Sequence, residues 1–444
     1  MKKILIFVLI FAFLITPLSV FSGANTNEAD ETVLSVVDVV DIINEDDAEA
    51  YGSQAAENAL ALQSDPVIIS SEKAFAVIFD GAVPAATYSN PSLQVKSASV
   101  ILMEASSGRI LFEKECDKQL PPASITKIMT MLLIMEALES GKIKYESMVQ
   151  CSEYAASMGG SQIFLEIGEQ MSVSDMLKGI AVSSGNDCCV AMAEFISGSE
   201  SAFVDEMNKK AKSLGMVNTV FVNCNGLDTD GHFSSARDIA LMTQALLKHP
   251  EILKYTSIWT DTLRDGAFGL ANTNKLVRFY SGANGMKTGF TAKAKYCVSS
   301  TALRDGMQLI AVTMGAATSP ERFSDASDLL NYGFANWTIF KDENLANEFF
   351  SGEVLKGVEL LFSAAVNGSV ELLVPKGKIG SVEKQVDFSD ILIAPVLKGS
   401  EIGFVTYSLE GSVLAKFPIS VTADIRALTF NDYFYRLFKQ FLIG

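Results

Sequence analysis

The sequence predicts a mixed α/β domain over residues 96–343, a small all-β domain over 344–424 and an amphipathic helix at 425–444. Three observations support this prediction. Runs with the 3.6-residue period of helices alternate with strand-like runs in the first region. Short β-rich runs separated by glycine turns fill the second. Aromatic residues recur at helical spacing at the end of the chain.

The negative charge is concentrated before the predicted domains. The 444 residues include 52 Asp and Glu against 35 Lys and Arg, a formal charge of −17. Residues 25–95 carry −12 of this charge, whereas residues 96–444 carry −7. Nucleic-acid binding needs clustered Lys and Arg, so no nucleic-acid partner is expected. Only two residues are His, which disfavours a histidine-rich metal site, and no metal or cofactor is expected.

The first 24 residues have the pattern of a signal peptide. Lys2 and Lys3 precede an apolar run at 4–15, and small residues follow it. This run is shorter than the ~20 residues that span a bilayer. Residues 25–95 keep no helical or strand period, and we interpret them as a poorly ordered acidic spacer. We therefore expect an exported protein.

The α/β region begins with a hairpin around Ser106, Ser107 and Gly108. Pro121 and Pro122 then lead into an apolar-periodic helix. We expect strands at 98–103, 109–113, 295–302 and 307–315, and helices at 124–138, 173–182, 187–197, 199–214, 236–248 and 320–340.

The region after Asn344 is expected to form a sandwich or barrel without a catalytic group, acting as a spacer or interaction module. Its predicted strand runs are 354–365, 370–375, 391–396, 403–409 and 413–419.

The last predicted helix, at 428–443, has an aromatic face. Phe430, Phe434, Leu437, Phe438 and Phe441 recur at spacings of three and four. The segment is too short and polar to span a membrane, and its composition is typical of a helix lying in the headgroup plane. The alternative is a helix docked on the protein's own core.

Six cysteines in an exported chain allow fifteen complete disulfide pairings. The adjacent Cys188 and Cys189 disfavour an ordinary disulfide framework, and a chain of this length does not need one. We expect free, mostly buried thiols. No CxxC spacing indicates a metal site.

Three short motifs occur in order. Ser124 and Lys127 are three residues apart on a predicted helix, so a lysine amine can take the proton of a serine hydroxyl. Ser184-Gly185-Asn186 lies in a break between two predicted helices, and Lys287-Thr288-Gly289 is expected to form a turn before a strand. Each motif alone is more often structural. Together, in this order, they form the signature of penicillin-recognising serine acyl-transferases and β-lactamases.

The sequence resembles the low-molecular-mass penicillin-binding proteins that are D-alanyl-D-alanine carboxypeptidases, serine peptidase family S11. The resemblance covers about residues 96–444, whereas the long spacer departs from the family pattern. It includes the three motifs, Gly159-Gly160-Ser161, Asn225-Gly226-Leu227 and the segment from Gly231 to Asp238 around His232. The β-rich domain and the amphipathic end also fit this family, which implies the serine β-lactamase and penicillin-binding-protein transpeptidase fold.

The resemblance implies a role for each residue of the first two motifs. Ser124 would attack the carbonyl between two D-alanines and form an acyl-enzyme, with Lys127 as general base. Ser184 would relay a proton to the departing D-alanine. Asn186 would hold Lys127 and the substrate amide.

The resemblance also implies how the substrate's carboxylate and the oxyanion are held. Lys287, Thr288 and Gly289 would form the carboxylate site, and Lys287 would help to keep Lys127 neutral by charge repulsion. The backbone N–H groups of Ser124 and Phe290 would form the oxyanion hole. His232 is interpreted as structural, since Lys127 already supplies a base.

The expected substrate is a peptidoglycan stem peptide ending in D-Ala-D-Ala, and β-lactams are expected to acylate Ser124. The expected location is the outer face of the cytoplasmic membrane, with attachment through the C-terminal helix. Alternatives are a DD-endopeptidase, a β-lactamase and an inactive penicillin-binding scaffold. No Glu-x-x-x-Asn motif of a class A β-lactamase lies between Ser184 and Lys287.

Overall fold

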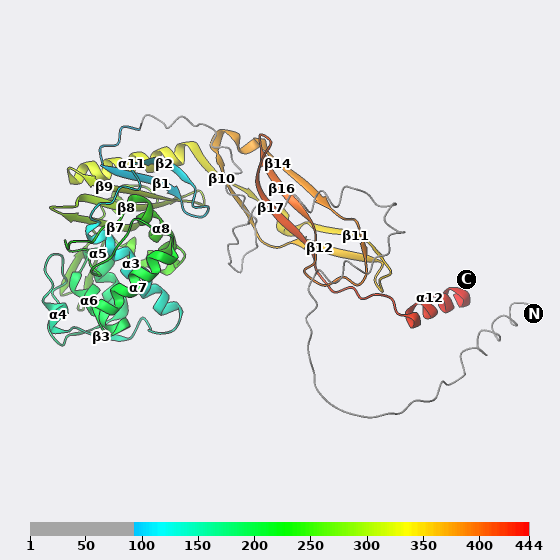
Figure 1. Ribbon diagram of the computed structural model, residues 1–444, viewed down its shortest axis with the longest axis horizontal. Coiled ribbons are helices and arrows are strands. Elements are labelled where there is room, and N and C mark those ends of the chain that lie inside the picture. The colour runs from blue at the N-terminus through cyan, green and yellow to red at the C-terminus, as the bar shows by residue number, and fades with distance from the viewer. Residues whose placement is uncertain (1–92, 444) are drawn as a thin grey trace, which may run out of the picture. The chain divides into compact units, whose positions relative to one another are not determined.

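The computed structural model describes residues 93–443. The predicted signal peptide and nearly all of the acidic spacer lie outside these residues. The described chain begins with an α/β region, continues into a β-rich region and ends in a helix (Figure 1). This order agrees with the predicted fold class, while the exact predicted domain boundaries stay predictions.

The α/β region is built on a five-stranded antiparallel sheet with the strand order β2-β1-β9-β8-β7. Its first and last strands in the chain are brought together because β1 pairs with β9, Ile101 facing Val312. The strands of this sheet are β1 (Ser99–Glu104), β2 (Ile110–Lys114), β7 (Ala283–Thr291), β8 (Lys295–Arg304) and β9 (Met307–Ala316).

Most helical segments of the α/β region lie between β2 and β7 in the chain. They are η3 (Ala123–Thr126), α3 (Lys127–Glu139), α4 (Glu153–Ala156), α5 (Val173–Ser183), α6 (Asn186–Ser197), α7 (Glu200–Ser213), α8 (Ala236–Leu247), η4 (Pro250–Ile252), α9 (Leu253–Thr256) and α10 (Leu276–Phe279). Two small ribbons accompany them, β3 (Met148–Gln150) with β4 (Gln170–Ser172), and β5 (Thr260–Leu263) with β6 (Phe268–Ala271). Helix α11 (Ser319–Asn336) follows β9.

The central sheet is apolar on both faces. Along β1, Ile101 and Met103 join the large core that contains α3, α5, α6 and α8, whereas Val100 and Leu102 join a second core beneath α11. Successive side chains of a strand point to opposite faces, so this alternation places helices on both sides of the sheet. Edge strand β7 stays open on one side and adjoins η3.

The β-rich region contains a six-stranded sheet with the order β14-β16-β17-β12-β11-β15, and β10 pairs separately with β13. Its elements are β10 (Trp337–Asp342), η5 (Leu345–Asn347), β11 (Phe349–Leu355), β12 (Leu361–Val366), β13 (Val370–Pro375), η6 (Lys376–Ser381), β14 (Val382–Phe388), β15 (Ile391–Ile393), β16 (Glu401–Leu409) and β17 (Ser412–Val421). A core of its own includes Phe362, Val405, Tyr407 and Phe417.

Three predicted elements were wrong in detail. The helix predicted at 320–340 ends at Asn336, because the apolar residues of β10 pair with β13. The run at 354–365 is interrupted by a turn, because β11 and β12 form a hairpin. The motif from Lys287 to Gly289 does not precede a strand but lies inside β7.

All six cysteines are buried and free, in agreement with the prediction of free, mostly buried thiols. The predicted terminal helix is present as α12 (Phe430–Ile443). In the part of the chain from 93 to 443, no helix is both long and apolar enough to cross a membrane.

Candidate active site

Ser124 and Lys127 lie at the junction of η3 and α3, where the chain enters the core. Helix α3 is buried on nearly every side, and Lys127 is fully buried in its first turn. Ser124 lies in the preceding 3-10 turn and stays partly exposed. The motif therefore places a reachable hydroxyl one turn from a desolvated amine.

The Lys127 amine has three oxygen neighbours. Its Nζ lies 2.9 Å from Ser124 Oγ, 2.6 Å from Asn186 Oδ1 and 2.6 Å from the Asn225 carbonyl oxygen. A neutral amine has two hydrogens and one lone pair. The two carbonyl oxygens can accept both hydrogens, which leaves the lone pair for the Ser124 hydroxyl proton.

The electrostatic surroundings of Lys127 favour that neutral form. Burial lowers the pKa of Lys127 below its usual value, while nearby Cys189, Cys224, Cys188 and Asp187 act in the opposite direction. Desolvation disfavours the charged form of any amine, and within residues 93–443 this amine is hydrogen-bonded to a hydroxyl, a side-chain amide and a backbone carbonyl rather than to a carboxylate. The pKa shift therefore moves Lys127 toward the function of a general base.

Ser184 and Asn186 are positioned by the break between α5 and α6. Ser184 caps α5 in the left-handed conformation with φ 65°, and Asn186 is the first residue of α6. Asn186 Nδ2 donates to the Gly159 carbonyl oxygen at 2.6 Å, which aims its Oδ1 at Lys127. The buried Ser184 Oγ has no hydrogen-bond partner among the described residues. Such a hydroxyl is available for a substrate or water.

The third motif lies along the open edge of the central sheet. Burial lowers the pKa of Lys287 well below its usual value, and repulsion from Lys127 lowers it further. The two amines are therefore electrostatically coupled and resist protonation at the same time. Thr288 Oγ1 donates to Thr273 Oγ1 at 2.7 Å, on the segment between β6 and α10.

Gly289 permits the close approach of β7 to the serine turn. A Cβ atom on Gly289 would lie 2.8 Å from the Pro122 carbonyl oxygen and 3.1 Å from the Ala123 Cβ. Any larger residue would push β7 away from η3. The next residue, Phe290, is 55% exposed and lies against Tyr296, with ring centroids 4.4 Å apart.

Arg322 is a site-supporting residue that the sequence analysis missed. Its Nη1 donates to the carbonyl oxygens of Gly289 at 3.0 Å and Cys297 at 3.2 Å, and so connects α11 to β7 and β8. Burial lowers the pKa of Arg322 to about 10. Its position in an amphipathic helix gave no signal of this contact, because the contact depends on how α11 packs on the sheet.

The structure thus brings the three motifs to one place through contacts and electrostatic coupling. Lys127 touches Ser124 and Asn186 and is coupled to Lys287, while Gly289 packs against the serine turn. Within residues 93–443, no group of three or more His, Cys, Asp or Glu side chains is arranged to hold a metal ion. A hydroxyl with an adjacent desolvated amine supports nucleophilic acyl transfer.

Family models match both regions of the chain. The model for D-alanyl-D-alanine carboxypeptidase matches residues 85–318, and the model for the penicillin-binding protein 5 C-terminal domain matches residues 341–427. The chain is 45% identical to the D-alanyl-D-alanine carboxypeptidase DacF of Bacillus subtilis, covering 77% of this chain and 89% of that protein. It is 34% identical to DacA of Escherichia coli, covering 75% and 84%.

Solved structures show the same relationship. Penicillin-binding protein 5 from Haemophilus influenzae has a TM-score of 0.65 at 34% identity, covering 75% of this chain and 98% of that chain. Penicillin-binding protein D2 from Listeria monocytogenes, in an ampicillin-bound form, has a TM-score of 0.51 at 32% identity. The latter match covers 55% of this chain and 100% of that chain.

Proposed function

The chain belongs to the D-alanyl-D-alanine carboxypeptidase family of penicillin-binding serine peptidases, and we propose that the site at Ser124 removes the terminal D-alanine from peptidoglycan stem pentapeptides. The enzyme is a serine-type hydrolase that acts through an acyl-enzyme. The observation that carries the assignment of roles is the geometry of Lys127, whose amine contacts Ser124 Oγ and two carbonyl oxygens.

Acylation begins with attack of Ser124 Oγ on the carbonyl carbon between the two D-alanines. The hydroxyl proton passes to the Lys127 lone pair as the Oγ–C bond forms. When the C–N bond breaks, the departing amine needs a proton, and the unpaired hydroxyl of Ser184 is suited to relay it. Water then attacks the ester, and the shortened peptide leaves.

The substrate's carboxylate has a second effect on the lysines. It binds beside Lys287 and Thr288, and its negative charge favours a proton on Lys287. Because Lys287 and Lys127 repel each other, charge on Lys287 favours the neutral amine on Lys127. Binding of the correct chain end thereby prepares the general base.

The oxyanion is assigned to two backbone donors, the N–H groups of Ser124 and Phe290. This assignment rests on the packing of Gly289 against η3, which brings the strand carrying Phe290 next to the serine turn. A donor of this kind typically contributes about 2.7–4 kcal/mol to transition-state stabilisation.

The test uses the purified chain without its first 24 residues. Free D-alanine is assayed with a pentapeptide ending in D-Ala-D-Ala, and labelling by fluorescent penicillin is followed in parallel. Wild-type protein is expected to give both signals, and Ser124→Ala neither. Release of D-alanine by Ser124→Ala would contradict the proposal.

Two further substrates distinguish the related activities. A cross-linked dimeric peptide tests DD-endopeptidase activity, and excess penicillin tests β-lactamase turnover. Carboxypeptidase activity predicts that the pentapeptide is the better substrate and that the penicilloyl-enzyme is long-lived. Rapid, repeated penicillin hydrolysis would favour a β-lactamase instead.

For location, we propose export and attachment to the outer face of the cytoplasmic membrane. The support is the exposure of aromatic and aliphatic side chains on α12, with Phe430 at 77% and Leu437 at 67%. On the other side of this helix, Arg436 Nη2 donates to the Val358 carbonyl oxygen at 2.5 Å. The polar side is therefore held by the protein, which leaves the aromatic face for a lipid surface.

Vesicle flotation tests this attachment. Full-length protein is expected to float with phospholipid vesicles, and a variant with Phe434→Ser and Phe438→Ser is expected to remain soluble. Phe404→Ser is the matched control, because it removes an exposed aromatic ring from β16. Equal flotation of all three proteins would contradict the proposal.

A further inference from the structure

One loop holds the nucleophile segment at four points. The loop spans residues 222–232, and the segment spans residues 123–130. Thr130 Oγ1 donates to the Cys224 carbonyl oxygen at 2.5 Å, and Lys127 donates to that of Asn225. A Cβ atom on Gly226 would lie 1.9 Å from the Ala123 carbonyl oxygen. The fourth contact joins His232 to Thr126.

The His232 contact is the only one of the four in which the loop contributes a side-chain polar atom. Thr126 lies between the nucleophile and the base, and its Oγ1 is 2.8 Å from His232 Nε2. The other ring nitrogen, Nδ1, accepts a hydrogen bond from the Val222 backbone N–H at 3.0 Å. A nitrogen that accepts carries no proton, so the neutral ring has its hydrogen on Nε2 and donates to Thr126.

The surroundings of His232 keep the ring in this state and orientation. The ring is 6% exposed and lies edge-on to Phe221, with centroids 5.9 Å apart. Burial lowers the pKa of His232 to about 4, opposed only by Asp228. The neighbouring backbone is fixed as well, because Phe233 pairs with Val220 and Ser234 pairs with Leu120.

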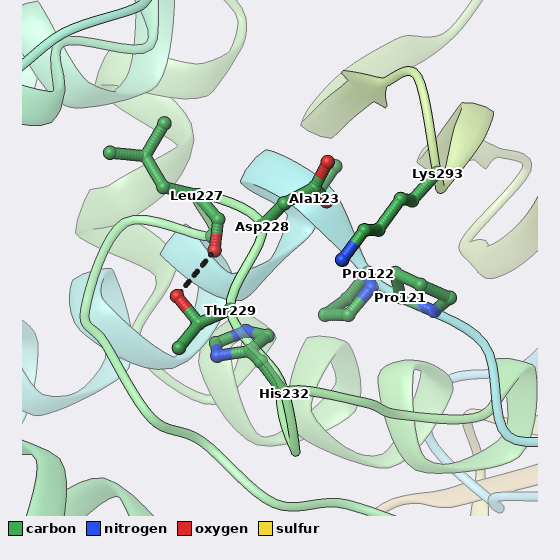
Figure 2. Close-up of a pocket in the computed structure, with 9 residues that line it drawn as sticks. Pro121, Pro122, Ala123, Leu227, Asp228, Thr229, His232 and Lys293 are labelled. Carbon is green, nitrogen blue, oxygen red and sulfur yellow. Dashed lines mark hydrogen bonds between the residues drawn. The ribbon is translucent and has the colours of Figure 1, made fainter.

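The ring also lies next to the entrance of the serine turn. Figure 2 shows His232 lining a small pocket with Pro122, Ala123 and Lys293. The turn itself is strained, since Ala123 has φ 49°, a conformation that non-glycine residues rarely adopt. Contacts hold the chain on both sides of this strained position. Before it, Leu120 pairs with Ser234, and after it, Thr126 is hydrogen-bonded to His232.

We infer that His232 is a positioning residue. It acts through Thr126 to keep Ser124 Oγ and Lys127 Nζ at the separation needed for proton transfer. It is not a base in the reaction, because both ring nitrogens are already engaged away from Ser124. The inference rests on the proposed function, since it assigns a role in acylation. A displacement of 1 Å in such a site can cost about 100-fold in rate.

A double-mutant cycle tests the hydrogen bond. His232→Asn retains an acceptor near the Nδ1 position and loses the donor to Thr126. Thr126→Val removes the acceptor without changing the shape of the side chain. The measured quantity is the second-order acylation rate constant with fluorescent penicillin, with the midpoint of thermal unfolding measured for each variant.

Each single variant is expected to acylate about 10- to 100-fold more slowly, and the double variant is expected to be no slower than the slower single variant. Thr126→Ser, which keeps the hydroxyl, is expected to restore at least a third of the wild-type rate. Variants are compared at a temperature where all of them are folded.

Multiplicative losses in the double variant would overturn the inference, as would unchanged acylation in variants that merely unfold earlier. A Thr126→Ser variant as slow as Thr126→Val would also overturn it. Failure of the proposed function has a different signature, because Ser124→Ala would then still release D-alanine or be labelled by penicillin. The two results are therefore distinguishable in the same assay.

Discussion

The Nζ atom of Lys127 lies 2.9 Å from Ser124 Oγ, and the two residues are one helical turn apart. The same nitrogen contacts two carbonyl oxygens that accept hydrogens and cannot donate them. In the proposed mechanism this arrangement sets the direction of proton transfer, because among residues 93–443 Ser124 supplies the only hydroxyl hydrogen-bonded to the amine.

Removing the amine is expected to stop acylation without unfolding the protein. Lys127→Met replaces a buried, desolvated amine by an apolar side chain of similar length, so the free energy of unfolding should not fall greatly. General bases typically contribute 10²- to 10⁴-fold, and we expect a loss of about that size in the acylation rate with penicillin. Lys178→Met, on the exterior of α5, is the control. Acylation of Lys127→Met within threefold of wild type would contradict the assignment.

The coupled lysines predict a bell-shaped pH dependence of kcat/KM. In the proposed mechanism the active pair holds one proton, because Lys127 accepts a proton from Ser124 and Lys287 attracts a carboxylate. Activity therefore falls on the acid side when both amines are charged and on the alkaline side when both are neutral. Since the pKa values of both lysines are lowered, the apparent pKa of each limb should lie below the usual pKa range of lysine.

Lys287→Arg tests the alkaline limb, because a guanidinium stays charged to higher pH than an amine. The variant is expected to lose some activity through its changed geometry and to keep its remaining activity at alkaline pH. An alkaline limb identical to that of wild type would show that Lys287 does not cause it.

The close packing of Gly289 against η3 predicts a selective effect of one methyl group. Gly289→Ala should displace β7 from the serine turn, lower the acylation rate at least tenfold and cost about 1–3 kcal/mol in the free energy of unfolding. Gly269→Ala is the matched control, since Gly269 also lies in a strand but has no atom within 4 Å of an added Cβ. Equal acylation by the two variants would contradict the packing argument.

His232 predicts a pH dependence of stability. The folded state holds this ring neutral with a pKa of about 4, whereas an unfolded histidine titrates near 6.5. Between these values the unfolded state binds more protons, so stability falls as the pH is lowered from about 6.5 to 4. The shifted pKa of His232 changes the free energy of unfolding by at most about 3 kcal/mol over this pH range.

Chemical denaturation at pH 7 and pH 4.5 measures this effect. The loss of stability between the two conditions is expected to be smaller in His232→Asn than in wild type, because asparagine does not titrate. The subtraction removes the contributions of carboxylates common to both proteins. The same loss in both proteins would show that the ring is not kept neutral by the fold.

The sequence predicted the local elements of the α/β region well where a helix or strand has its own periodicity. Helices α5, α6 and α8 begin and end within one residue of the predicted limits, because each is a run rich in apolar residues that a break terminates. The order of the three motifs likewise identified the family, since their chemistry resides in residue types and spacing.

Elements that depend on distant partners were predicted less well. Strand β7 has low intrinsic strand propensity, with Asn284, Gly285 and Gly289 in its sequence, and it forms through pairing with β8. The segment 337–342 appeared to continue a helix, and its pairing with β13 makes it a strand. Arg322 became part of the site only through the packing of α11.

The sequence by itself thus determined the pairing of Ser124 with Lys127, the proposed nucleophile and base, since a spacing of three residues places them one helical turn apart. Only the tertiary structure decided the state of that pair. The depressed pKa of Lys127, its carbonyl partners at Asn186 and Asn225 and the contact of His232 with Thr126 all arise from segments 59 to 106 residues away. Desolvation and hydrogen bonding depend on neighbours in space, and the fold alone brings these neighbours together.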